Sequence, residues 1–141
     1  MVDKKNLATS SHSFKAIYDK DIPWEDGADI NILTLPKGVK VKIFSKDDAM
    51  KRVDMKVKFP PGFVEPAHSH KSWHSICVLK GRMCVAGKDL RPGDYVFGWD
   101  ELHGPYEYPD GCEAFVVLLL VRLIGRLIRL LFILWTTNGM F

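Results

Sequence analysis

The sequence lacks the short motifs that mark several large enzyme classes. It contains no glycine-rich phosphate loop, no Gly-x-Ser-x-Gly turn and no Cys-x-x-Cys pair. These absences argue against a P-loop nucleotide site, an α/β-hydrolase nucleophile and a dithiol redox centre. Internal repeats are also absent, which favours a single domain in a chain of 141 residues.

Cysteine is scarce, since Cys77, Cys84 and Cys112 are the three in the chain. An odd number, in a sequence that opens on a polar segment without a signal peptide, predicts a reducing, cytoplasmic setting. If Lys80-Gly81 forms a two-residue hairpin turn, Cys77 lies directly across from Cys84. Because cross-strand disulfides are strained, we expect these two residues to be small buried thiols.

Excess charge is small, with 20 basic and 17 acidic residues. Three of the basic residues, Arg122, Arg126 and Arg129, lie in a segment from 114 to 141 that has no acid. The first 113 residues are therefore neutral overall. Because no basic stripe interleaved with aromatic residues occurs in them, we expect no nucleic acid partner.

Helical periodicity is missing from the body of the chain, and strand-like alternation takes its place. Apolar residues alternate with polar ones over residues 39–43 and again over residues 53–59, which predicts two strands with one wet face each. Further short strands are predicted at Ser75–Leu79, Met83–Ala86, Tyr95–Gly98 and Ala114–Val121. Such short strands, separated by turns, predict an all-β antiparallel barrel or sandwich.

Three histidines, His68, His70 and His74, lie within a stretch of seven residues. His68 and His70 flank a single serine, so in an extended strand both side chains face the same side. Two neighbouring imidazoles form half of a first-row metal site. His74 precedes an apolar run, so a neighbouring strand would present a third nitrogen to the same point. A fourth ligand would have to come from further along the chain.

The spacing of these histidines resembles that of the cupins, small β-barrel proteins with a metal inside the barrel. The first cupin motif has four matching positions here, which are Gly62, His68, His70 and Gly81, and one substituted ligand position, His74. Cupins usually carry glutamate where this chain has His74. The second motif is similar to residues 90–97 and places its histidine at His103, with Gly98 in place of the usual proline. The resemblance covers residues 59–119.

The resemblance implies a single antiparallel double-stranded β-helix, the cupin jelly-roll barrel, with an N-terminal arm and an apolar C-terminal tail. We divide the chain into a loose N-terminal segment over residues 1–22, a barrel over residues 23–121 and a basic, apolar tail over residues 122–141. Because barrels of this family commonly pair through their outer sheets, a homodimer is expected.

The metal ligands that the resemblance implies are His68, His70, His74 and His103. An alternative role for His74 is to orient a bound ligand or water without touching the metal. Imidazole nitrogens suit a divalent first-row metal. Fe(II) is expected first, with Zn(II), Ni(II), Cu(II) and Mn(II) as alternatives.

The all-histidine ligand set of this chain resembles that of particular cupins, the acetylacetone-cleaving dioxygenase and related diketone or hydroxyacetophenone dioxygenases, which hold ferrous iron. This implies a non-haem Fe(II) dioxygenase that cleaves a carbon–carbon bond in a small β-dicarbonyl or phenolic ketone. Residues 108–117 are also similar to the barrel closure of anti-sigma-factor cupins, some of which bind zinc without known catalysis. The alternatives are therefore a non-catalytic zinc-binding sensor module and a metal-dependent lyase or isomerase.

Residues beside the histidines are candidates for a substrate pocket and for proton transfer. Four aromatic residues are expected to line an apolar pocket, namely Trp73, Phe97, Trp99 and Tyr106. Asp100 and Glu101 lie just before His103 and are candidate proton acceptors, which a solvated loop explains equally well. Glu65 is expected to be exposed.

The C-terminal tail departs from the strand pattern. Residues 115–135 form an apolar run of nearly membrane-spanning length, interrupted by Gly125 and the three arginines. Arginines in mid-span are costly in lipid, and the start of the run is needed for the last strand of the barrel. We therefore expect an amphipathic helix that docks on the body or on a second subunit, with contact to a membrane surface as the alternative.

Overall fold

The computed structural model describes residues 15–30, 35–99 and 101–119, and in them the chain forms two antiparallel β-sheets. The larger sheet has the order β1-β2-β3-β10-β5-β8, and the smaller has the order β4-β9-β6-β7. The strands of the larger sheet are β1 (Glu25–Asp26), β2 (Lys40–Asp47), β3 (Arg52–Phe59), β10 (Cys112–Leu119), β5 (Trp73–Gly81) and β8 (Tyr95–Gly98). Those of the smaller sheet are β4 (Phe63–Glu65), β9 (Tyr106–Tyr108), β6 (Met83–Val85) and β7 (Lys88–Leu90). No α-helix occurs in the described residues, so the predicted all-β jelly roll is confirmed.

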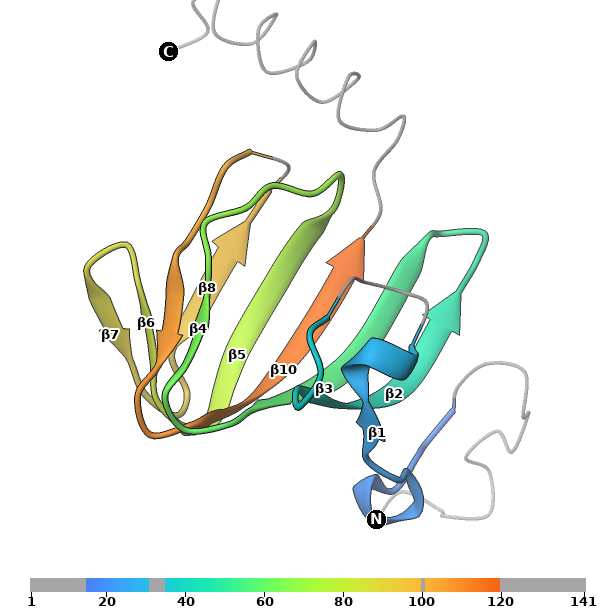
Figure 1. Cartoon of the computed structure of the whole chain (residues 1–141). Coiled ribbons are helices and arrows are strands. Elements are labelled where there is room, and N and C mark those ends of the chain that lie inside the picture. Colours follow the sequence, from blue (N-terminus) through green and yellow to red (C-terminus); the bar gives the residue numbers. More distant parts are fainter. Residues whose placement is uncertain (1–14, 31–34, 100, 120–141) are drawn as a thin grey trace, which may run out of the picture.

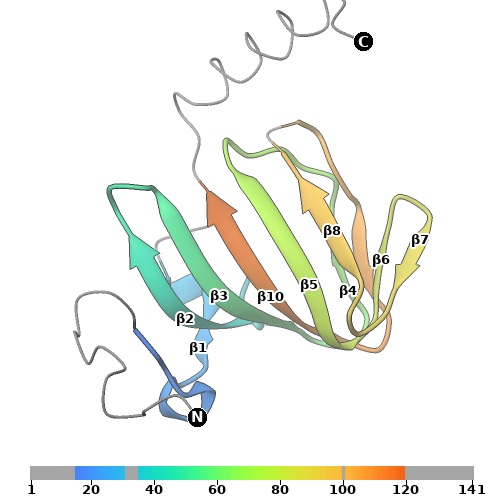
Figure 2. The ribbon, with the colours of Figure 1, turned by 180° about the vertical axis from the view of Figure 1, so that it is seen from behind.

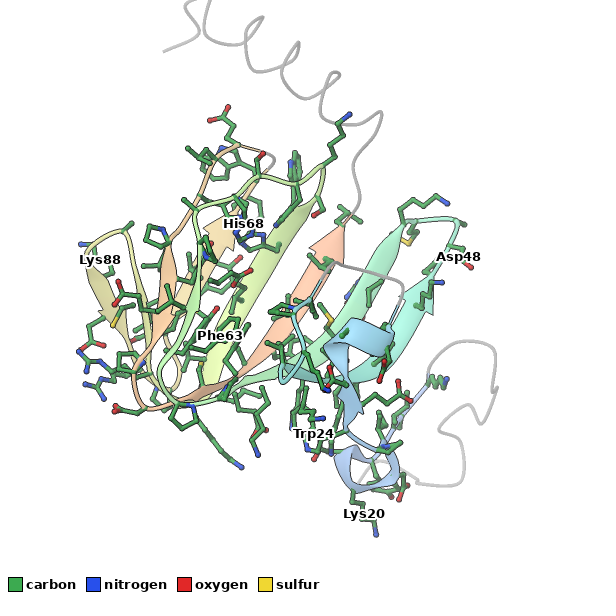
Figure 3. The ribbon with its side chains drawn as sticks, in the orientation of Figure 1. Lys20, Trp24, Asp48, Phe63, His68 and Lys88 are labelled. Atoms are coloured by element: carbon green, nitrogen blue, oxygen red, sulfur yellow. The ribbon has the colours of Figure 1, made fainter. Side chains whose placement is uncertain are left out.

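Figures 1 and 2 show β6 and β7 at one end of the molecule and β2 at the other, with β5 and β10 between them. In Figure 3, Phe63 and His68 lie in the interior of the view, while Lys20, Asp48 and Lys88 lie at its periphery. The predicted tail over residues 122–141 lies outside the described residues, as does Asp100. No helix among the described residues is long and apolar enough to cross a membrane.

The core is built from the alternation that the sequence displays. In β10 the residues with even numbers, such as Ala114, Val116 and Leu118, are buried, and the odd ones between them are only half-buried. In β3 the apolar residues predicted for one face are buried as expected, and they pair with β10 so that Met55 is the partner of Val116. Burying both apolar rows against the opposite sheet is what stabilises the sandwich.

The N-terminal arm packs on the outer side of β2 and β3. Asp19, in the 3-10 turn η2 (Asp19–Asp21), accepts a hydrogen bond from Lys56 Nζ at 2.8 Å and pairs with Lys42 Nζ at 3.3 Å. Trp24 lies beneath the Lys42 ammonium, 5.0 Å from the ring centroid. The boundary predicted at residue 23 therefore falls inside a segment that already contacts the barrel. A second 3-10 turn, η3 (Gly27–Asp29), follows β1.

The hairpin predicted at Lys80-Gly81 is wrong. β5 pairs with β10 and β8 in the larger sheet, whereas β6 pairs with β7 and β9 in the smaller one. Gly81 has a φ of +76°, and a Cβ there would collide with the carbonyl oxygen of Gly111. At this glycine the chain crosses from one sheet to the other. Cys77 therefore lies beside Phe115, far from the position opposite Cys84, and the cysteines are free thiols.

Candidate metal centre

Three of the four predicted histidines converge on one point. His68 and His70 lie on the segment between β4 and β5, and His103 lies on the segment between β8 and β9. One ring nitrogen from each lies within 4.8 Å of those of the other two. The ring centroids of His68 and His103 are 4.6 Å apart, and those of His70 and His103 are 4.7 Å apart.

A backbone bridge fixes the relative position of the two histidine-bearing segments. The N–H of His68 donates to the carbonyl oxygen of His103, and the N–H of His103 donates to that of His68, both at 2.9 Å. The two cupin-like motifs are therefore joined at their histidines by main-chain hydrogen bonds, and the side chains need no metal to be brought together.

The Nδ1 atom of each converging ring lies within hydrogen-bonding distance of a neighbouring group. His68 Nδ1 lies 2.7 Å from the Pro66 carbonyl oxygen, and His103 Nδ1 lies 2.6 Å from the Glu101 carbonyl oxygen. His70 Nδ1 lies 2.6 Å from the Ser72 hydroxyl. Because a carbonyl only accepts, Nδ1 of His68 and of His103 carries the proton and Nε2 is left as a lone pair.

The Nε2 atom of His103 is buried and has no hydrogen-bond partner in the described part of the protein. A buried polar atom without a partner is costly, and a metal ion would satisfy it together with the Nε2 atoms of His68 and His70. Burial, followed by the neighbouring His103 and His68, lowers the pKa of His70. A neutral imidazole is the form that binds a metal, so these residues fit a divalent first-row ion.

His74 lies beside this group and outside it. Its ring centroid is 5.1 Å from that of His70 and 4.9 Å from that of His103. Its Nε2 faces the Tyr106 hydroxyl at 3.3 Å, and Gly98 on β8 leaves the space that its ring occupies. Burial, followed by the neighbouring imidazoles, lowers the pKa of His74 to about 4. His74 therefore contacts Tyr106, while both of its predicted roles, as a metal ligand and as a residue that orients a bound ligand or water, stay predictions.

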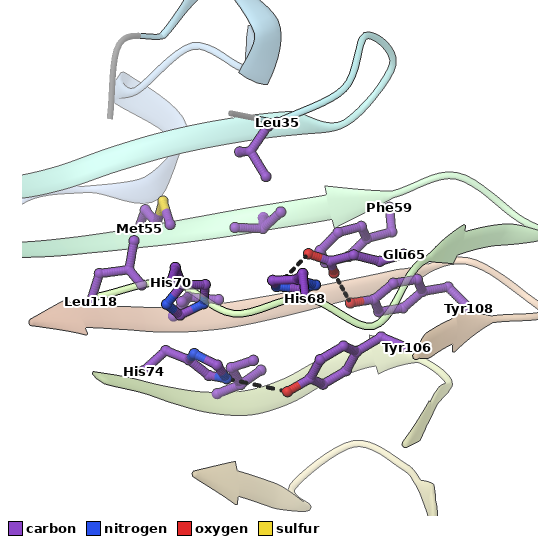
Figure 4. Close-up of a pocket in the computed structure, with 13 residues that line it drawn as sticks. Leu35, Met55, Phe59, Glu65, His68, His70, His74, Tyr106, Tyr108 and Leu118 are labelled. Atoms are coloured by element: carbon purple, nitrogen blue, oxygen red, sulfur yellow. Dashed lines mark hydrogen bonds and ion pairs between the residues drawn. The ribbon is translucent and has the colours of Figure 1, made fainter. Parts of the chain in front are cut away.

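An apolar cavity of about 60 Å³ opens beside the histidines (Figure 4). Its apolar wall comes from the larger sheet, where Met55, Val116 and Leu118 point inward. Its polar groups come from His68, His70 and His74 and from three other residues, Glu65, Tyr106 and Tyr108. A small apolar cavity with a few convergent polar groups is typical of a site for a compact ligand.

The chain matches the family model of the ChrR cupin-like domain over residues 18–121. The chain belongs to this cupin-like family. The match begins at residue 18, in agreement with the ordered contacts of Asp19. Among curated proteins, none matches the sequence closely enough to count as a relative.

Solved cupins share the fold at low sequence identity. An RmlC-like cupin from Ralstonia eutropha JMP134 is 18% identical with a TM-score of 0.61, over 74% of this chain and 68% of that one. An acetylacetone dioxygenase from Acinetobacter johnsonii is 17% identical with a TM-score of 0.58, over 83% and 80% of the two chains. The polyketide cyclase RemF from Streptomyces resistomycificus is 22% identical with a TM-score of 0.59, over 77% and 80%. At these identities the similarity establishes the fold.

Of the four aromatic residues predicted to line the pocket of this cupin, Tyr106 does so, whereas the other three do not. Trp73 and Phe97 alternate with the inward-facing His74 and Gly98, so they point to the outer face of the larger sheet. Trp99 continues this outer cluster, with its ring centroid 5.4 Å from that of Phe97. The prediction is therefore wrong for these three residues, and the two-residue period of a strand would have shown it.

Two tyrosines complete the cavity of the cupin. Burial, and then the carboxylate of Glu65, raise the pKa of Tyr106 to about 12, so its hydroxyl keeps its proton at neutral pH. Tyr108 is buried, and its ring stacks on Phe59 with centroids 3.9 Å apart. Its hydroxyl donates to Glu65 Oε2 at 3.2 Å. Tyr108 is not among the residues predicted to line the pocket.

The candidate acids are placed differently from the expectation. The side chain of Glu65 is 26% exposed and lines the cavity, so the prediction that it is exposed is wrong. Val64, the residue before it, takes the outward position instead. Glu101 contributes its carbonyl oxygen to the His103 ring, and its role as a proton acceptor stays a prediction.

Proposed function

We propose that this cupin is a non-haem Fe(II) dioxygenase that cleaves a carbon–carbon bond in an enolisable β-dicarbonyl or phenolic ketone. The observation that carries the proposal is the convergence of three imidazole nitrogens, with no glutamate at position 74, beside an apolar cavity that His68 and His70 line. Similarity of fold to an acetylacetone dioxygenase supports the reaction class.

His68, His70 and His103 would hold the metal. Ferrous iron, when bound, supplies a Lewis acid for the oxygens of the substrate and a route for electrons to O₂. Three protein ligands leave positions open for a substrate that binds through two oxygens. Zinc, nickel, copper and manganese are the other candidates for the same nitrogens.

The surroundings of the metal would orient the substrate and exclude water. The protonated hydroxyl of Tyr106, held by His74, would donate a hydrogen bond to a carbonyl oxygen of the substrate. The apolar wall formed by Met55, Val116 and Leu118 keeps bulk water away from the reacting carbon. A volume of about 60 Å³ favours a compact diketone over a larger phenolic ketone.

The direct test is oxygen consumption by protein that is purified anaerobically and loaded with Fe(II). With short β-diketones in an oxygen electrode, we expect substrate-dependent uptake of one O₂ per molecule cleaved. His68→Gln should abolish uptake and metal binding, and Tyr106→Phe should lower the rate while the metal is retained. Glu107→Gln, on the exposed side of β9, is the matched control. Iron-loaded protein that consumes no oxygen with any enolisable compound would refute the proposal.

A second candidate uses the same site without redox chemistry. The polyketide cyclase RemF has a similar fold, and a metal that polarises a carbonyl would serve a cyclase, lyase or isomerase. In that case zinc-loaded protein would convert the substrate without oxygen. A protein that binds zinc and a ligand but converts nothing would be the sensor or binding module.

A further inference from the structure

We infer that Glu65 is a fourth ligand of the metal, supplied from β4 and oriented by Tyr108. The inference rests on the proposed metal centre and adds to it a carboxylate from a strand that the histidine motifs do not include.

Glu65 and His68 face each other with two hydrogen-bond acceptor atoms. The Nδ1–H of His68 donates to the Pro66 carbonyl, so its Nε2 presents a lone pair. Oε1 of Glu65 lies 3.5 Å from this Nε2, and a carboxylate oxygen also presents a lone pair (Figure 4). Two lone pairs in contact repel each other, and a cation between them turns the repulsion into attraction.

The distance itself suits two ligands of one ion. Ligand nitrogens and oxygens lie about 2.1 Å from a first-row metal, so two neighbouring ligands of one ion are roughly 3.0 Å apart in an octahedral shell, which keeps positions open for a substrate, and about 3.4 Å apart in a tetrahedral one. The observed 3.5 Å between Glu65 Oε1 and His68 Nε2 agrees with this spacing. Glu65 lies outside the group of three nitrogens that lie within 4.8 Å of one another, so binding of the ion has to draw its carboxylate toward His70 and His103, which the three rotatable bonds of the side chain allow.

The carboxylate is also held in its orientation. Tyr108 donates to Oε2 at 3.2 Å, which turns Oε1 toward His68. Tyr108 is 1% exposed and stacks on Phe59 with an interplanar angle of 5°, so its hydroxyl has little freedom. A hydrogen-bond donor fixed behind a ligating carboxylate is the usual support for a metal ligand.

The charge balance of the metal centre also favours a carboxylate ligand. Three neutral imidazoles leave the full charge of a divalent ion uncompensated in an apolar cavity, which is costly. Among the described residues that line the cavity, Glu65 is the one acid. Position 74, beside His70 and His103, is occupied by an imidazole that faces Tyr106 and contributes no negative charge. Glu65 therefore supplies the negative charge that this centre otherwise lacks.

The test is the affinity of the intact chain for zinc and cobalt. Competition with a chromophoric chelator gives the affinity, and the visible spectrum of the Co(II) protein reports the ligand set. We expect Glu65→Gln to weaken zinc binding by at least about tenfold and to change the Co(II) spectrum. Tyr108→Phe should give a smaller loss. Glu107→Gln, an exposed acid on the neighbouring strand β9, is the matched control and should change neither readout.

The outcomes separate this inference from the proposed function. If Glu65→Gln keeps the affinity and spectrum of the parent while His68→Gln loses both, the inference is overturned and the histidine centre stands. If the parent itself binds neither metal, the centre and the inference both fail. Circular dichroism checks folding, and Glu65→Asp, which keeps the charge on a shorter side chain, replaces Glu65→Gln if that variant does not fold. An affinity for Glu65→Asp equal to that of Glu65→Ala would also overturn the inference.

Discussion

Gly98 is a position at which the site has no room for a side chain. It pairs with His74 across β5 and β8, and a Cβ added to it would approach Cε1 of the His74 ring to 2.5 Å. The substitution Gly98→Ala should therefore push the imidazole away from β8. Because His74 Nε2 lies 3.3 Å from the Tyr106 hydroxyl, the same displacement should break that contact.

The expected cost follows from three contributions. Adding atoms to a well-packed interior costs about 1–3 kcal/mol, and His74 is only 4% exposed, so its ring has little space to yield. Loss of a hydrogen bond costs about 1 kcal/mol more. Alanine is favoured over glycine within a strand by about 0.5–1 kcal/mol. The net prediction is a loss of about 1–3 kcal/mol in the free energy of unfolding.

A double-mutant cycle with His74→Ala measures the contact itself. Urea unfolding of the metal-free protein gives the free energy of unfolding for the parent, both single variants and the double variant. Once the ring is removed, Gly98→Ala should cost nothing or should stabilise by about 0.5–1 kcal/mol. An equal cost in the presence and absence of the His74 ring would refute the reasoning, because the loss would then arise in the backbone of β8.

Three further predictions concern pH, glycine and metal. Because His74 has a pKa lowered to about 4, the unfolded chain takes up its proton first, and the metal-free protein should lose up to about 3 kcal/mol between pH 6.5 and pH 4. Urea unfolding across that range checks this, and His74→Ala should remove most of the loss. Gly81→Ala, with a positive φ and a collision with Gly111, should cost more than about 2 kcal/mol in thermal melts, against about 1 kcal/mol for Gly87→Ala, where the space is open. Zinc at 100 times its dissociation constant should add about 2.7 kcal/mol, which a chelator or His68→Gln should abolish.

The long strands of the larger sheet, β2, β3, β5 and β10, were predictable because they have enough residues to display their period. Residues 53–59 alternate in sequence as they alternate in burial. The pair His68 and His70 likewise follows from spacing alone, and the structure brings both to one point. The sequence did not predict β1, β4, β7 and β9, whose two or three residues are too few to reveal a period of two, although the equally short β6 was predicted.

In β4 (Phe63–Glu65), burial is the reverse of what hydropathy predicts, because the apolar residue is exposed and the acidic one faces the interior. Val64 points outward and is 54% exposed, while Glu65 points into the cavity. The assignment is set by a partner distant in the sequence, since Phe63 pairs with Tyr108 and Glu65 with Tyr106. Only that pairing reveals that the acid belongs to the site. Hydropathy alone would place Val64 in the interior and Glu65 on the surface.

The backbone prepares the metal centre before an ion is bound. Two main-chain hydrogen bonds of 2.9 Å hold His68 against His103, although they lie in different motifs. The Nδ1 atom of each ring is tied to a carbonyl only two residues away. Since these contacts already fix the relative position and the tautomer of both rings, binding needs to order little further chain. The free energy of metal binding should therefore appear as added stability of a fold that also exists without the metal.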